Sequence, residues 1–67
     1  MEPYEITYKA NFLILEKSKK WLCDELGITQ HTLNRRLVEQ DWKKTEMFFI
    51  DHMHTHIKAE KGGLSVI

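Results

Sequence analysis

The stretch from residue 18 to residue 37, SKKWLCDELGITQHTLNRRL, decides the fold of this chain. It holds two short helical patterns separated by Gly27, a residue type at which a helix can end in a left-handed conformation without steric cost. Ser18 and Thr29 stand where the two helices would begin, and their hydroxyls can accept a backbone hydrogen bond there. Because Thr29 follows Gly27 by only two residues, the second helix must cross the first at a steep angle.

Both patterns have an apolar edge at helical spacing, made by Leu22, Cys23 and Leu26 in the first and by Ile28, Leu33 and Leu37 in the second. The outward positions of the second pattern are polar or basic, namely Gln30, His31, Thr32, Asn34, Arg35 and Arg36. Several of these side chains belong to the types that read base edges or bind phosphates in DNA. The segment therefore predicts a helix-turn-helix whose second helix contacts DNA.

The same segment resembles the helix-turn-helix of small phage and bacterial repressors of the Cro and lambda-repressor type. The residues that carry the resemblance are Ser18, Leu22, Cys23, Gly27, Ile28 and Leu33, followed by Asp41-Trp42-Lys43-Lys44, which looks like the continuation in compact phage versions. Arg36 departs from the pattern, since many members have an apolar residue at that position. The resemblance implies a compact all-α domain of about four helices.

The resemblance also implies which residues contact DNA. The base contacts in the major groove would be Gln30, His31, Asn34 and Arg35. Phosphate contacts would come from Ser18 and Lys19 at a helix start, and from Lys43 and Lys44. The predicted phosphate set also contains Lys20, Thr29, Thr32 and Arg36. For Arg36, a salt bridge within the protein is the other interpretation.

The residues before the motif allow two interpretations. Read as a helix from Pro3 to Leu15, they place Ile6, Ala10 and Leu13 on one stripe, and Pro3 suits the first turn. Read as a strand, apolar residues alternate at positions 6, 8, 10, 12 and 14. We predict a helix because the motif needs a supporting helix, with a short strand at Tyr4 to Tyr8 as the alternative.

After the motif, Thr45 can cap a helix from about residue 46 to residue 60, which Gly62 and Gly63 would stop. Residues 64–67 are left open between a tail and a short strand. Phe48, Phe49 and Met53 lie on this helix, and so small a domain cannot hide all three, so we predict a dimer interface there.

Three histidines of this last helix, His52, His54 and His56, suggest a metal site at first sight. His52 and His56 share a face, but no third ligand is evident and Cys23 is distant in sequence. We predict no metal. A plain polar face and a pH-sensitive dimer contact both stay open.

Composition sets wider bounds. The 67 residues suit one domain spanning residues 1–67, whose core would supply only roughly 3–5 kcal/mol of net stability, so a partner subunit is plausible. The longest apolar run, Phe12 to Leu15, is too short for a membrane span, and one cysteine indicates a reducing cytoplasm. The formal net charge is zero, but residues 17–44 hold seven basic side chains against four acidic ones.

The sequence thus predicts an all-α, single-domain protein that binds a pseudo-palindromic double-stranded DNA operator as a homodimer. Its expected role is that of a cytoplasmic, nucleoid-associated repressor or Cro-like regulator from a phage or mobile element. We expect no enzyme activity, no cofactor, no membrane and no small-molecule substrate. The alternative is a protein-interaction module on the same scaffold, such as an anti-repressor or host-takeover factor, and RNA binding is a weaker rival.

Overall fold

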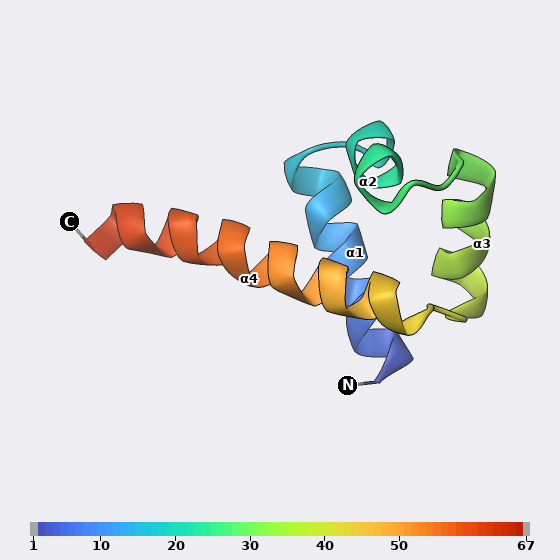
Figure 1. Ribbon diagram of the computed structural model, residues 1–67. Helices are drawn as coiled ribbons and strands as arrows, with labels where there is room; N and C mark the ends of the chain where they lie inside the picture. The colour runs from blue at the N-terminus through green and yellow to red at the C-terminus, as the bar shows by residue number, and fades with distance from the viewer. Residues whose placement is uncertain (1, 67) are drawn as a thin grey trace.

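A computed structural model describes the backbone of residues 2–66 and the side chains of residues 2–60. The described chain is helical, and no strand occurs between residues 2 and 66. The helices are α1 (Pro3–Glu16), α2 (Lys19–Leu26), α3 (Gln30–Glu39) and α4 (Lys44–Val66), arranged as Figure 1 shows. The predicted all-α fold of about four helices is therefore confirmed.

The segment before the motif, for which the sequence allows a helix or a strand, is a helix in the structure. Pro3 occupies the first turn of α1, and Ile6, Ala10 and Leu13 have no exposed surface. This spacing buries one side of a helix, as predicted. The alternative of a strand at Tyr4 to Tyr8 is wrong, because Tyr8 is 69% exposed while its neighbours in the supposed alternation are buried.

The last helix is longer than the sequence suggested at both ends. It begins at Lys44, one residue before Thr45, because the Glu46 carboxylate accepts a hydrogen bond from the Lys43 N–H at 2.9 Å. It also continues through Gly62 and Gly63 to Val66, so the predicted stop at the glycines is wrong. A helical glycine costs only about 1 kcal/mol and does not by itself end a helix. The suggested strand at 64–67 is wrong up to Val66, and Ile67 lies outside the described residues.

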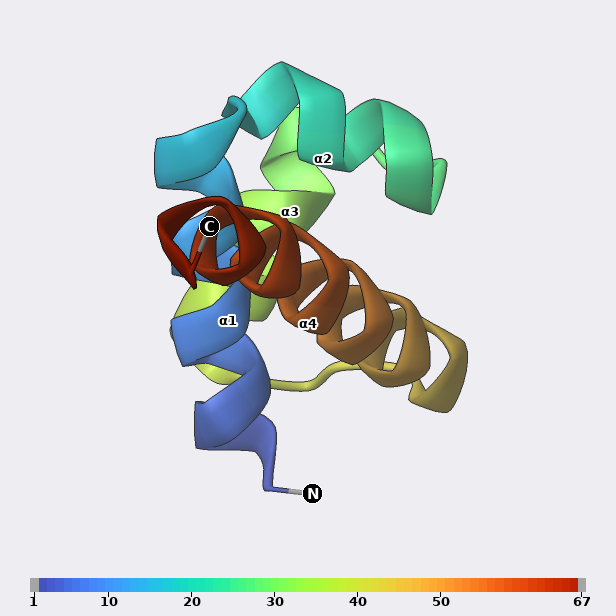
Figure 2. The same cartoon turned by 90° about the vertical axis from the view of Figure 1, so that its left-hand side faces the viewer.

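The core forms where α1 contacts each of the other three helices. Its buried hydrophobic side chains are Ile6, Ala10, Leu13, Leu22, Cys23, Leu33, Trp42, Ile50 and Ile57. Trp42 also donates a hydrogen bond from its ring N–H to the Thr7 hydroxyl at 3.0 Å, which ties the loop before α4 to α1. Figures 1 and 2 show α4 crossing α1, and Figure 1 shows its C-terminal end extending beyond the other helices. None of the helices within residues 2–66 is long and apolar enough to cross a membrane.

The histidines of α4 lie in different surroundings. His54 is 9% exposed and packs edge-on against Phe12 of α1, with ring centroids 4.8 Å apart. His52 and His56 are exposed, and His56 Nε2 lies 3.2 Å from Glu60 Oε1. The interpretation as a plain polar face is therefore wrong for His54. No group of three or more His, Cys, Asp or Glu residues suited to a metal occurs in the described part of the chain.

The burial of His54 predicts that the protein loses stability in mild acid. Burial lowers the pKa of His54, and the charges of Lys9 and Lys58 lower it further, while Asp51 opposes them. Below its ordinary pKa of about 6.5, the unfolded chain therefore takes up a proton more readily than the folded one. Stability should be full above that pH and fall as the pH drops through the lowered pKa, measured as the urea midpoint at about pH 7.5 and about pH 5.

The matched control for this pH dependence uses two histidines of one helix. His54→Gln should flatten the change in urea midpoint between the two pH values, whereas His52→Gln, at an exposed position, should keep it. The lowered pKa of Asp51 keeps that carboxylate ionised across this window. An unchanged pH dependence in the His54 variant would show that another group is responsible.

Candidate nucleic-acid interface

Local hydrogen bonds set the shape of the helix-turn-helix. The Ser18 hydroxyl accepts the Trp21 N–H at 2.9 Å and so caps α2. Gly27 ends α2 in the left-handed region, with φ 70° and ψ 34°. The Thr29 hydroxyl then accepts the Thr32 N–H at 3.1 Å and caps α3. Both predicted caps and the predicted glycine turn are confirmed.

The inner side of α3 holds it against the core. Leu33 has no exposed surface, and Leu37 packs partly buried against the same cluster. The four side chains predicted to contact bases are all exposed on the other side, namely Gln30, His31, Asn34 and Arg35. They occur at i, i+1, i+4 and i+5, so one continuous strip of the helix surface carries them.

Two of these side chains have partners within the protein. Lys19, the first residue of α2, donates a hydrogen bond from Nζ to Asn34 Oδ1 at 2.7 Å. Arg35 Nη2 lies 4.0 Å from Asp41 Oδ2, and both side chains are about half exposed. An exposed ion pair of this kind is worth little and can exchange for another partner. The strip is therefore accessible, with its second turn linked to the start of α2.

Arg36 requires a correction. Its side chain is buried, with Nε 3.0 Å from Glu46 Oε1 and Nη1 3.6 Å from Asp41 Oδ2. The predicted phosphate contact is wrong for this residue, and the salt-bridge interpretation is right. Arg36 follows Leu33 by three residues, so both lie on the inner side of α3.

Glu46 was not among the predicted site residues, although its carboxylate pairs with the buried Arg36 guanidinium. Its carboxylate accepts hydrogen bonds from both Arg36 Nε and the Lys43 N–H. A buried charge is stable only when it is paired and hydrogen-bonded, and here both conditions are met. A glutamate three residues after a helix start is the usual signal for such a capping contact, and Lys43 to Glu46 has that spacing.

The other predicted phosphate contacts fall into two groups. Ser18 and Thr29 use their hydroxyls as helix caps, and the Thr32 hydroxyl accepts a hydrogen bond from the Thr29 hydroxyl at 3.1 Å. The remaining contacts are exposed lysines: Lys19 and Lys20 at the start of α2, and Lys43 and Lys44 at the start of α4. Because α2 precedes α3 and α4 follows it, the lysines come from segments joined to opposite ends of α3 (Figure 1).

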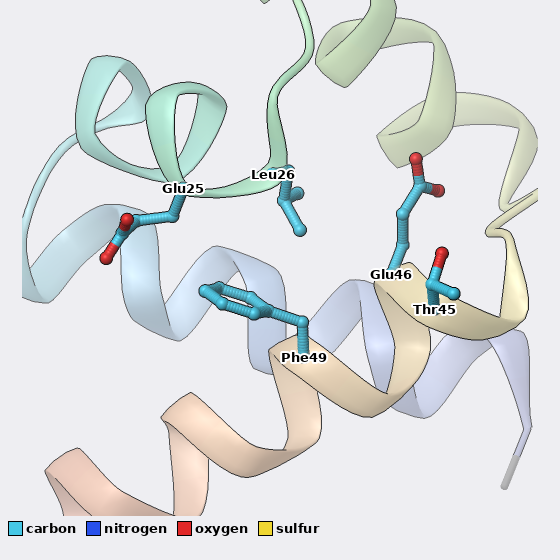
Figure 3. A pocket seen from close by; sticks show the side chains of 5 residues that line it. All are labelled: Glu25, Leu26, Thr45, Glu46 and Phe49. Atoms are coloured by element: carbon cyan, nitrogen blue, oxygen red, sulfur yellow. The ribbon is translucent and has the colours of Figure 1, made fainter.

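The predicted dimer residues differ in exposure. Phe48 is 68% exposed, whereas Phe49 and Met53 are partly buried. Phe49 and Leu26 line a shallow pocket of about 210 Å³ between α2 and α4, together with Glu25, Thr45 and Glu46 (Figure 3). Phe48 is thus the one of the three that is mostly available to a partner.

Comparisons with known proteins found no match to the chain among protein-family models, curated proteins or solved structures.

Proposed function

We propose that this protein binds double-stranded DNA sequence-specifically, with α3 in the major groove. The observation that carries the proposal is the strip formed by Gln30, His31, Asn34 and Arg35. All four side chains are exposed, while the opposite side of the same short helix is part of the core. Amides and guanidinium groups on such a strip can pair with base edges.

We further propose that the protein acts as a homodimer on a pseudo-palindromic operator, with two α3 helices in successive major grooves about 34 Å apart. The formal net charge of zero predicts weak non-specific binding, so two protomers and their base contacts must supply most of the affinity. The exposed ring of Phe48 supports a protein contact on α4. In this proposal the protein is a cytoplasmic repressor or Cro-like regulator that acts by occupying its operator.

Binding to duplex DNA as a function of salt tests the proposal most directly. A protein that contacts phosphates loses affinity log-linearly as salt rises, with a slope of about −0.9 per phosphate neutralised. Selection of bound sequences from a random duplex pool should return an inverted repeat. Little affinity for any duplex at low salt would contradict the proposal.

Arg35→Ala should weaken operator binding by about 1–3 kcal/mol and relax the base preference at one position of each half-site. The arginine is exposed, so its removal should leave folding intact. Lys44→Ala is the matched control, because this exposed lysine should contact only phosphate and its loss should weaken all sequences alike. Titrations with the selected operator and its single-base variants separate the two outcomes, and wild-type behaviour of both variants would contradict this docking.

A protein-interaction module is the second candidate. The exposed aromatic residues favour it, since Tyr4, Tyr8 and Phe48 are each more than 60% exposed. An adaptor of this kind would show little affinity for duplex DNA even at low salt, so the same titration distinguishes the two functions.

A further inference from the structure

The contact between Lys19 and Asn34 joins the two helices of the motif at the surface. Lys19 Nζ lies 2.7 Å from Asn34 Oδ1, although the residues are 15 positions apart in sequence. Both side chains are exposed, so the contact lies on the outside of the motif and not in its core. It joins a lysine expected to contact phosphate to an asparagine expected to contact a base.

This contact fixes which end of the Asn34 amide faces outward. A lysine ammonium has three donors and no acceptor, so only the amide oxygen can face it. A hydrogen bond from a charged donor is stronger than one between neutral groups, which favours retention of this orientation. The Asn34 Nδ2 group makes no hydrogen bond within residues 2–60 and stays available as a donor.

The orientation changes what Asn34 can read. A free asparagine pairs with adenine through two bonds, because its oxygen accepts from N6 and its nitrogen donates to N7. With one lone pair of the Asn34 oxygen taken by the Lys19 ammonium, the pair presents mostly donors and a positive charge, namely Asn34 Nδ2 and the two remaining N–H groups of Lys19. In the major groove, guanine offers two acceptors, N7 and O6, whereas adenine places its N6 donor against the ammonium.

We propose, on the basis of the proposed DNA binding, that Lys19 is a positioning residue that makes Asn34 selective for guanine over adenine. The selectivity comes from a side chain on α2 and not from α3 alone. Lys19 keeps two further N–H donors, so it can still contact a phosphate.

The experiment measures base preference at the one operator position that Asn34 contacts. Asn34→Ala identifies that position as the one where the preference relaxes. Wild type, Lys19→Ala, Lys19→Arg and Lys20→Ala are then titrated with duplexes that carry each of the four bases there. Lys20→Ala removes the same charge from the adjacent exposed residue and serves as the matched control.

Wild type should prefer guanine over adenine by at least about fivefold, the lower end for a good base contact. Lys19→Ala should lose this preference or reverse it towards adenine, and Lys19→Arg, which restores a donor, should keep it. Lys20→Ala should leave the preference unchanged. An adenine preference in wild type, or a guanine preference retained in Lys19→Ala, would overturn the inference while leaving DNA binding in place.

A second measurement needs no DNA. In the free protein, Lys19→Ala should shift the side-chain amide resonances of Asn34 in a ¹H–¹⁵N spectrum, and Lys20→Ala should not. Unshifted resonances in Lys19→Ala would show that the contact does not form in solution and would also overturn the inference. Absence of duplex binding in every variant would instead overturn the proposed function, and the base selectivity with it.

Discussion

Replacing Glu46 with alanine is expected to destabilise the protein by about 3–5 kcal/mol. Glu46 is 6% exposed, and its Oε1 accepts hydrogen bonds from Arg36 Nε at 3.0 Å and from the Lys43 N–H at 2.9 Å. The alanine variant would leave a buried guanidinium whose remaining carboxylate, on Asp41, is half exposed and 3.6 Å away. Because a domain of this size has roughly 3–5 kcal/mol in total, a large part of the variant should be unfolded at room temperature.

Two controls make this expectation specific to the buried pair. Asp41→Ala removes the exposed carboxylate from the same arginine and should cost less than about 1 kcal/mol. The double variant Arg36→Met with Glu46→Leu removes both charges and should recover most of the stability. Urea unfolding followed by circular dichroism measures all three. A single Glu46→Ala variant within about 1 kcal/mol of wild type would contradict the assigned role of this pair.

Leu33→Ala is expected to cost about 2–5 kcal/mol, the usual range for a fully buried leucine. Leu33 has no exposed surface and lies in the core that α3 shares with α1 and α2. The truncation removes apolar contacts and leaves a cavity at the base of the helix that presents the candidate strip. Thermal unfolding should therefore shift to a much lower midpoint, and any DNA binding should weaken with it.

The matched control is Val38→Ala, because Val38 is on the same helix but 80% exposed. Its substitution should change stability by no more than about 0.5 kcal/mol. A Leu33 variant that unfolds at the wild-type temperature, or a Val38 variant as unstable as the Leu33 variant, would show that the inner side of α3 has been assigned wrongly.

The helices of the motif could be predicted because their signals are local. Ser18, Gly27 and Thr29 act through hydrogen bonds or backbone angles that involve residues no more than four positions away. The apolar spacing of Leu22 and Leu33 depends only on helical geometry, and both residues are buried as expected. The exposed strip on α3 follows from the same periodicity.

The contacts that modify the candidate site could not be predicted in this way. The Arg36 to Glu46 ion pair, the Lys19 to Asn34 hydrogen bond and the burial of His54 against Phe12 each join different helices. Whether such side chains meet depends on the angle and register at which the helices cross, and helical periodicity carries no information about either.

The amino-acid sequence by itself determined where both motif helices begin, where the first of them ends and which sides of them are apolar, since capping and periodicity act within one or two turns. The second motif helix extends past the predicted Leu37 to Glu39. Only the tertiary structure decided that the Arg36 side chain is buried and that Lys19 forms a hydrogen bond with Asn34. It also decided that α4 continues past its glycines. The physical reason is that these outcomes depend on how whole helices pack, or on energy differences of about 1 kcal/mol per residue that local patterns do not resolve.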